Sequence, residues 1–190
     1  MYRIVIFASG SGTNAENIIK YFKDSSLATV NYVISNNPEA GVLERVKKLG
    51  VPSRVYNRKE ISSETFLQFL KKEADFIVLA GFLLKVPDLI IEAFPDSIVN
   101  IHPALLPKYG GKGMYGMHVH RAVVDNKEPI TGITIHYVNE NYDEGAIIYQ
   151  KSVKLEGSDT ADDVAAKIHV LEQENFPRVI EETLKVKNEG

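Results

Sequence analysis

The sequence predicts an α/β fold: a single domain with an open, mostly parallel sheet and helices on both of its faces. Two observations favour this fold. Short runs rich in Ile, Val and Leu alternate along the chain with segments of helical periodicity. The run Phe76–Ala80 is apolar throughout, as in a strand that helices cover on both sides. The 190 residues contain no repeat or linker, so we expect one domain spanning residues 1–190.

About seven strands are expected, each a short apolar or alternating run bounded by turn-forming residues. They are Tyr2–Ala8, Ala28–Ser35, Ser53–Tyr56, Asp75–Ala80, Ser97–Ile101, Thr131–Val138 and Ala146–Lys154. In the last two strands apolar and polar residues alternate, and the connection Asn139–Gly145 between them resembles a loop. This pattern predicts that the last pair of strands is antiparallel.

Helices are expected between the strands, at Thr13–Lys23, Pro38–Leu49, Ser63–Glu73, Pro87–Ala93 and Met117–Asp125. Pro38 and Pro87 are compatible with a first helical turn, where the N–H that proline lacks would be unpaired in any residue. A long terminal helix is expected to begin near Thr160, with Asp163 three residues on as a capping-box-like signal. Pro177 lies inside this helix, so we expect a kink there.

A Rossmann-like sheet of this kind binds ligands outside the C-terminal ends of its strands, near the point where the strand order reverses. Three motifs fall at the expected C-terminal ends of strands, namely Ser9–Asn14, Gly81–Val86 and Asn100–Pro107. Their coincidence predicts a ligand site at that edge of the sheet.

The composition excludes several classes of function. The formal net charge is −3 and no basic stripe with interleaved aromatic residues occurs, so nucleic acid is not expected as a partner. Because the chain has no cysteine, disulfides, thiol nucleophiles and thiolate metal sites are excluded. The apolar run at the N-terminus is too short for a signal peptide, and no transmembrane run exists. We therefore expect a cytoplasmic location and no membrane partner.

The loop Ser9–Asn14 joins the first strand to the first helix and carries two glycines. Glycines let the backbone approach an anion closely, and a helix N-terminus offers unpaired N–H groups. The loop has no Gly-Lys-Ser/Thr, and of the dinucleotide fingerprint it matches only the relaxed G-x-G-x-x-A form, without the later acid that reads the ribose. It suits a monophosphate better than a dinucleotide, and a tight turn without any ligand is the alternative.

The segment Asn100–Pro107 places an amide and an imidazole just past a strand end. Asn100 and His102 suit an oxyanion that develops during acyl transfer, and histidine also exchanges protons near neutral pH. A core histidine with satisfied hydrogen bonds is the alternative. Asp143 could orient the imidazole and raise its pKa, but the residues do not distinguish it from Glu144 or from an ordinary solvated turn.

The other histidines and one glycine-rich loop leave alternatives open. His118 and His120 form an H-x-H pair, but residues two apart on a helix do not share a face, and no third ligand follows at metal spacing, so no metal is expected. His136 either faces the site or packs in the core, and His169 is expected to be structural. The stretch 110–117 holds four glycines and is either a gate over the site or a plain surface loop.

Together these residues resemble the glycinamide ribonucleotide (phosphoribosylglycinamide) formyltransferases, folate-dependent enzymes of purine synthesis. The resemblance covers nearly the whole chain, from the Ser-Gly-Ser-Gly-Thr-Asn loop through Leu79–Phe82 and Asn100–Tyr109 to Asp143–Gly145 and the terminal helix. The motif Asn-Ile-His-Pro-x-Leu-Leu-Pro is specific to transferases and hydrolases that use formyl-folate. The resemblance implies direct transfer of a formyl group from 10-formyltetrahydrofolate to a primary amine of the ribonucleotide, with no tightly bound cofactor.

The resemblance also implies roles for individual residues. Asn100 and His102 would bind the oxyanion, and Asp143 would hold His102 protonated. The binding residues implied are Gly12, Thr13 and Asn14 for the phosphate, Glu172 for the glycinamide amine, and Arg58, Leu83, Leu84, Lys85, Val86 and Asn100 for the folate. The phosphate would then belong to an N-terminal half of about residues 1–100, and the folate and the chemistry to a C-terminal half of about residues 75–190.

Three other functions compete with this interpretation. Hydrolysis of 10-formyltetrahydrofolate would use the same Asn-His-Asp set, but such relatives usually carry an extra N-terminal domain, and this chain starts directly at the first strand. Formyl transfer to methionyl-tRNA is disfavoured because no basic C-terminal domain follows residue 190. A non-catalytic nucleotide-binding domain is the third. We expect small-molecule substrates as partners, and a monomer or weak homodimer.

Overall fold

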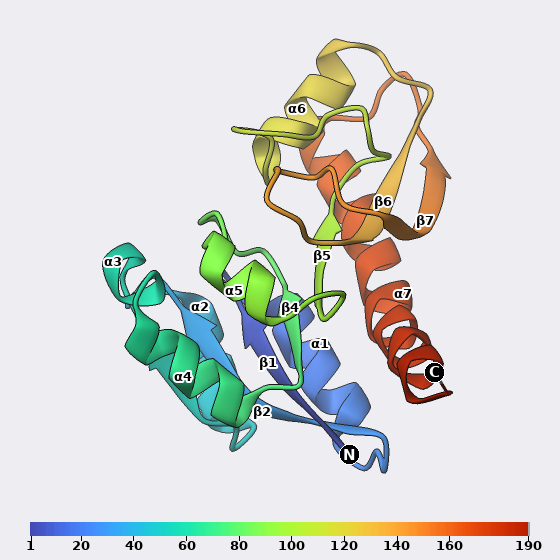
Figure 1. Ribbon diagram of the computed structural model, residues 1–190. Coiled ribbons are helices and arrows are strands. Elements are labelled where there is room, and N and C mark those ends of the chain that lie inside the picture. The colour runs from blue at the N-terminus through green and yellow to red at the C-terminus, as the bar shows by residue number, and fades with distance from the viewer. Residues whose placement is uncertain (190) are drawn as a thin grey trace.

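The computed structural model describes residues 1–189 and forms one α/β domain (Figure 1). Its elements follow in the order β1 (Tyr2–Phe7), α1 (Thr13–Phe22), β2 (Ala28–Ser35), α2 (Gly41–Lys48), β3 (Ser53–Val55), α3 (Arg58–Ile61), α4 (Glu64–Glu73), β4 (Phe76–Leu79), α5 (Asp88–Ala93), β5 (Ile98–His102), α6 (Met117–Asp125), β6 (Ile130–Tyr137), β7 (Ile147–Lys154) and α7 (Ala161–Glu189). Among these residues no helix combines the length and apolar character needed to cross a membrane.

The strands form one 7-stranded sheet in the order β3-β2-β1-β4-β5-β6-β7. The first five strands of that order run parallel, whereas β6 is antiparallel to β5 and β7 is antiparallel to β6. This confirms the mostly parallel sheet with an antiparallel last pair. The strand order reverses between β1 and β4, so the loops that follow these two strands diverge there and leave room for a ligand.

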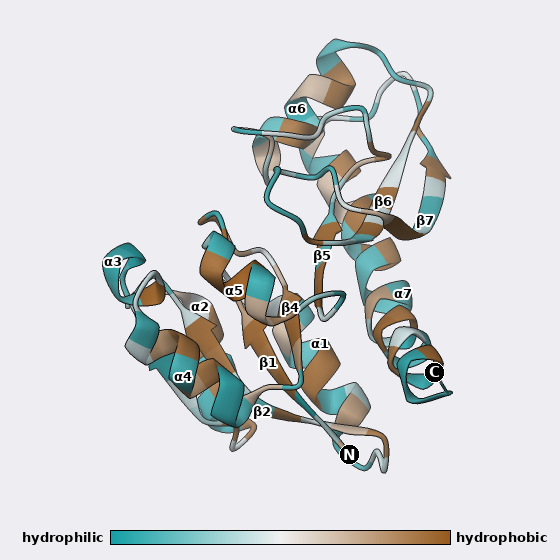
Figure 2. Ribbon diagram, viewed as in Figure 1, coloured by the Kyte–Doolittle hydropathy of each residue, from teal (hydrophilic) through white to brown (hydrophobic). Residues whose placement is uncertain are grey.

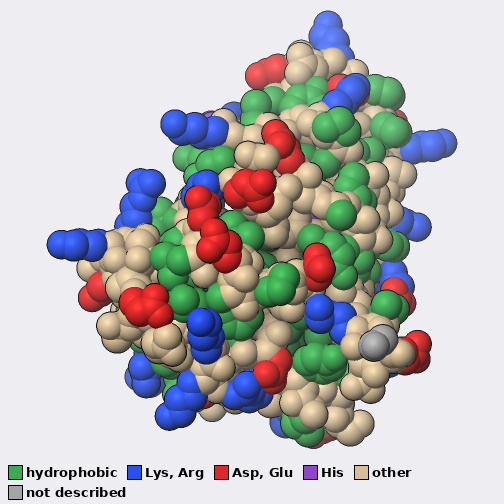
Figure 3. Space-filling model, in the orientation of Figure 1, with side chains coloured by type: hydrophobic (Ala, Val, Ile, Leu, Met, Phe, Trp, Pro, Cys, Tyr) green, Lys and Arg blue, Asp and Glu red, His purple; other side chains and the backbone are tan. Residues whose placement is uncertain are grey.

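Helices cover both faces of the sheet, and side chains alternate between the faces along each strand. Ile4 and Ile6 of β1 pack in a core with residues of α1, α2, α6 and α7. Val5 and Phe7 point the other way, into a core formed with α3, α4 and α5. Figure 2 shows the apolar strands between these layers, with hydrophilic residues on the outer sides of helices such as α4. Acidic and basic side chains are dispersed over the face seen in Figure 3.

Two elements differ from the sequence-based expectation. The helix expected from Pro38 begins at Gly41, because Asn37 Oδ1 accepts the N–H of Glu39 at 3.0 Å in a separate turn before it. The short helix α3 was not predicted. Its signal is present in the sequence, since Asn57 and Glu60 form a reciprocal capping box, but a helix of four residues has no measurable periodicity.

Helix α7 continues through Pro177. A proline cannot donate to the carbonyl four residues before it, which here belongs to Gln173. Asn17 Nδ2 of α1 donates to this carbonyl instead, at 2.8 Å. A side chain of another helix thus satisfies the group that the proline leaves unpaired, and it fastens α7 to α1 close to the C-terminal edge of the sheet.

Candidate active site

A cleft of about 880 Å³ lies at the C-terminal ends of β1, β4 and β5. Most of the expected site residues line it, namely Gly12, Thr13, Asn14, Leu83, Leu84, Lys85, Val86, Asn100, His102, Asp143 and Glu172. Arg58 is the exception. It lines a smaller neighbouring pocket of about 200 Å³, which shares Leu84, Lys85 and Val86 with the main cleft.

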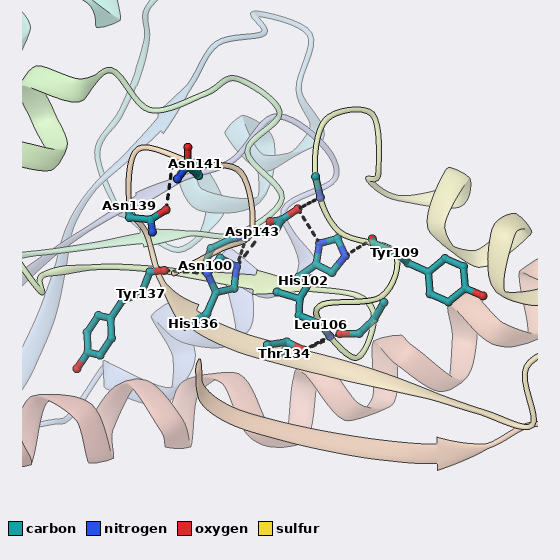
Figure 4. Close-up of polar contacts among 12 residues, drawn as sticks. Asn100, His102, Leu106, Tyr109, Thr134, His136, Tyr137, Asn139, Asn141 and Asp143 are labelled. Atoms are coloured by element: carbon teal, nitrogen blue, oxygen red, sulfur yellow. Dashed lines mark hydrogen bonds and ion pairs between the residues drawn. The ribbon is translucent and has the colours of Figure 1, made fainter. Parts of the chain in front are cut away.

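Asn100 and His102 belong to the end of β5, and because they are two residues apart they face the same side of the sheet. Asp143 reaches them from the loop between β6 and β7, as Figure 4 shows. Its Oδ2 lies 3.6 Å from His102 Nδ1. The structure therefore brings together the amide, the imidazole and the carboxylate that the sequence marks as candidates, and it selects Asp143 over Glu144.

His136 is part of this cluster. It lies directly across the β5–β6 ladder from Asn100, and Asn100 Nδ2 lies 3.1 Å from its Nε2. Its Nδ1 lies 2.8 Å from the Tyr137 carbonyl, which can only accept, so Nδ1 carries the proton and Nε2 accepts from Asn100. Asp143 Oδ1 is 3.6 Å from the same Nε2. Of the two alternatives for His136, the structure supports the site.

Backbone groups of Tyr109 and of the glycine-rich stretch 110–117 complete the contacts of the cluster. The Tyr109 carbonyl accepts a hydrogen bond from His102 Nε2 at 2.7 Å. The N–H of Gly111 donates to Asp143 Oδ2 at 2.9 Å. The bond to Tyr109 fixes the neutral tautomer of His102 with its proton on Nε2, so Nδ1, which faces Asp143, is the nitrogen that gains or loses a proton.

Two positions hold the surrounding loops in place. Thr134 Oγ1 donates to the Ala104 carbonyl at 2.7 Å and accepts the Leu106 N–H at 3.0 Å, which anchors the turn after His102. Gly145 lies so close to β6 that a Cβ there would be 1.7 Å from the Tyr137 carbonyl oxygen. The glycine thus lets the Asp143 loop return tightly to the sheet, next to the histidines.

Burial dominates the electrostatics of His102. It lowers the pKa of the imidazole, and the nearby Asp143 carboxylate and the Tyr109 carbonyl only partly oppose it. The direction is opposite to the expected protonated His102, because a 3.6 Å contact does not outweigh the desolvation. For Asp143, burial raises the pKa, but His136, His102 and the Gly111 N–H together bring it below the ordinary value. The carboxylate is therefore ionised at neutral pH.

The loop after β1 and helix α7 form another part of the cleft wall. Asn14 Nδ2 donates to Glu172 Oε2 at 3.0 Å, and Gln173 Nε2 donates to Asn14 Oδ1 at 3.0 Å. Glu172 lines the cleft, yet the protein surrounds its carboxyl so closely that burial raises its pKa to about 7, with the Asn14 bond acting in the other direction.

The two histidines of the H-x-H pair lie in α6. Residues 1–189 hold no group of three or more His, Cys, Asp or Glu side chains placed to bind a metal ion. His118 packs edge-on against Tyr115. His120 is buried and its Nδ1 has no hydrogen-bond partner in the described part of the chain, and burial lowers its pKa.

Comparison with known proteins places this site in a family. Residues 2–180 match the family described as Formyl transferase. The chain belongs to the formyl transferase family. The match spans both the loop after β1 and the Asn100–His102–Asp143 cluster, so the whole cleft lies within the shared domain.

Individual members of the formyl transferase family agree with this assignment. The chain is 32% identical to a phosphoribosylglycinamide formyltransferase of Bacillus subtilis, over 100% of this chain and 98% of that protein. It is 35% identical to a chloroplastic protein of the same name from Arabidopsis thaliana, over 99% of this chain and 68% of that one. The crystal structure of phosphoribosylglycinamide formyltransferase from Bacillus halodurans gives a TM-score of 0.84 at 38% identity, covering 97% of this chain and 94% of that one.

These similarities confirm the predicted α/β fold, the resemblance to phosphoribosylglycinamide formyltransferases and the prediction of a formyl transferase enzyme. The roles of individual residues stay predictions. The sequence reasoning missed the Tyr109 carbonyl and the Gly111 N–H, which no side-chain pattern signals, and it left His136 undecided.

Proposed function

We propose that this protein transfers the formyl group of 10-formyltetrahydrofolate to the primary amine of glycinamide ribonucleotide in purine biosynthesis. One observation supports this most strongly. The Asn100, His102 and Asp143 side chains line the same cleft as the glycine-containing loop Ser9–Asn14, which leads into the N-terminus of α1. A phosphorylated substrate anchored on that loop can extend its amine toward an oxyanion site on β5.

The chemistry follows from the groups present. The amine attacks the formyl carbon, and the carbonyl oxygen becomes an oxyanion. Asn100 stabilises this charge with the amide hydrogen that His136 leaves free, since an amide nitrogen carries two. As the tetrahedral intermediate collapses, the bond to the folate nitrogen breaks, the amine loses a proton and that nitrogen gains one. Asp143, ionised beside His102, accepts and returns this proton.

His102 must change one of its contacts before it can donate a hydrogen bond to the oxyanion. Its two ring nitrogens face the Tyr109 carbonyl and Asp143. To donate to the oxyanion, the imidazole exchanges one of these partners for the substrate. The carbonyl is the better candidate for exchange, because Tyr109 leads into a glycine-rich loop that itself lines the cleft, whereas the loss of Asp143 would leave a buried charge uncompensated.

The proposal also assigns each substrate to a part of the cleft. The phosphate lies on Gly12, Thr13 and Asn14, with Glu172 toward the glycinamide amine. The folate lies along Leu83–Val86, and Arg58 meets it where it passes into the smaller pocket, a place suited to an anionic group. We also propose that the protein is cytoplasmic and that it is a monomer or a weak homodimer; the word chloroplastic belongs to the names of plant relatives.

Formyl transfer from 10-formyltetrahydrofolate to glycinamide ribonucleotide, followed by product analysis, tests the proposal. The expected result is formylglycinamide ribonucleotide and tetrahydrofolate in equal amounts. Tetrahydrofolate and formate without the formylated ribonucleotide would identify a hydrolase instead. Binding of the ribonucleotide with no turnover of the folate would identify a non-catalytic nucleotide-binding domain.

A further inference from the structure

Helix α2 supports the loop Ser9–Asn14, which follows β1, without taking part in the cleft wall. Its residues do not line the cleft, yet two of them bond to consecutive carbonyl groups of that loop. The Val42 N–H donates to the Gly10 carbonyl at 3.0 Å. The guanidinium of Arg45 donates from Nε to the Ser11 carbonyl at 2.8 Å. Both carbonyls are therefore turned toward α2.

The orientation of a carbonyl fixes the N–H of the next residue. A trans peptide is planar, with its C=O and N–H groups pointing in opposite directions. Because the Gly10 and Ser11 carbonyls face α2, the N–H groups of Ser11 and Gly12 face away from it. Neither finds a hydrogen-bond acceptor within residues 1–189, and both residues line the cleft. Such paired backbone donors are the groups that an anion needs.

An acidic side chain beside this site needs compensation. Glu16 lies in the first turn of α1, where a carboxylate stabilises the helix but repels a phosphate bound at the same end. Hydrogen bonds from Lys20 and Arg45 lower the pKa of Glu16, so it stays ionised. Lys20 Nζ contacts one carboxylate oxygen at 2.6 Å, and Arg45 Nη1 contacts the other at 2.5 Å. Arg45 thus neutralises Glu16 and holds Ser11 with the same guanidinium.

We propose that Arg45 is a positioning residue for the substrate phosphate: it turns the Ser11–Gly12 peptide so that its N–H faces the cleft, and it neutralises Glu16. The inference rests on the proposed phosphate role of the loop. Arginine suits this task because its planar fork donates from Nε and Nη1 to two acceptors at fixed angles, which a single ammonium does not reproduce. The side chain does not touch the substrate in this arrangement; it acts through Ser11 and Glu16.

The variant Arg45→Gln removes both contacts, and Lys20→Met is the matched control. Lys20 pairs with the same carboxylate but has no bond to Ser11. We expect Arg45→Gln to raise the KM and the calorimetric Kd for glycinamide ribonucleotide about tenfold, with kcat and the folate KM unchanged. Amide hydrogen exchange should accelerate at Val42 and Glu16, whose N–H groups donate to the Gly10 and Gly12 carbonyls of the loop. Arg45→Lys should fall between the two proteins, and Lys20→Met should resemble the wild type.

Both contacts of Arg45 are partly exposed, so the variant should fold, and its hydrogen exchange outside the loop reports this directly. Wild-type exchange at Val42 and Glu16 together with wild-type ribonucleotide binding in Arg45→Gln would overturn the proposal. An equal loss in Lys20→Met would reduce the role of Arg45 to charge compensation and overturn the positioning role. If the wild-type protein transfers no formyl group, the proposed function fails, while loop exchange and the binding of inorganic phosphate still decide the role of Arg45.

Discussion

The Nδ1 atom of His102 lies 3.6 Å from Oδ2 of Asp143, too far for a hydrogen bond and close enough for strong charge coupling. Both side chains are largely withdrawn from water, and His102 is 3% exposed. Burial lowers the pKa of the imidazole more than the carboxylate raises it. In the substrate-free protein His102 is therefore mostly neutral near pH 7, while Asp143 is ionised.

This balance predicts the effect of Asp143→Asn on His102. The substitution removes the negative charge that favours the imidazolium, while the burial remains. The pKa of His102 should therefore fall further below its ordinary value than in the wild type, as measured by NMR titration of the ring proton signals. Asp88→Asn, an exposed carboxylate paired with Lys85, should leave the titration unchanged. An unchanged or higher His102 pKa in Asp143→Asn would show that the Asp143 carboxylate does not favour the imidazolium.

A second prediction concerns catalysis. Removing one stabilising group of an oxyanion site typically lowers kcat by about 10²–10³. We expect His102→Ala and Asp143→Asn each to lose kcat by about this factor, with much smaller changes in both KM values, because the groups act mainly on the transition state. Steady-state kinetics with both substrates measures this.

His118→Ala is the matched control for that experiment. It removes another imidazole from the same part of the chain, but His118 does not line the cleft. Its kcat should stay close to that of the wild type. Near-normal turnover in His102→Ala or Asp143→Asn would contradict the roles proposed for these residues.

Much of this site could be predicted from the sequence, because strand ends and glycine loops are local signals. The positions of Asn100 and His102 follow from the end of one apolar strand. His136 could not be decided, since its face depends on the register of β6 against β5, and only that pairing sets it opposite Asn100. The partners of His102 and Asp143 at Tyr109 and Gly111 are backbone groups, which have no signature in side-chain type.

A third prediction follows from Glu172, whose pKa burial raises to about 7. The folded protein then binds a proton more tightly than the unfolded chain, where a glutamate titrates near its ordinary value. The resulting stabilisation is complete below that ordinary value and is lost as the pH rises through about 7. Between pH 4.5 and pH 8 this one group should cost about 2–3 kcal/mol of unfolding free energy.

Glu172→Gln isolates the contribution because it keeps the shape and removes the titration. Urea denaturation of both proteins at several pH values gives the difference in unfolding free energy. That difference should shift in favour of the glutamine variant as the pH rises from 5 to about 7 and then level off, because the folded and unfolded states bind different numbers of protons only between the two pKa values of Glu172. Parallel pH profiles for the two proteins would show that Glu172 keeps an ordinary pKa in the folded state.

The last prediction concerns the backbone of the loop after β1. Gly12 has a φ of 78°, and a Cβ built there would lie 2.4 Å from Val42 Cγ2 and 2.6 Å from its Cα. An alanine must therefore strain its own backbone and push α2 away. Gly12→Ala should lower the unfolding free energy by about 2–4 kcal/mol and weaken ribonucleotide binding. Gly10→Ala is the control for stability, since a Cβ at Gly10 meets nothing within 4 Å. Its unfolding free energy should change by less than about 0.5 kcal/mol, and equal losses in the two variants would mean that the contact with Val42 does not hold this loop.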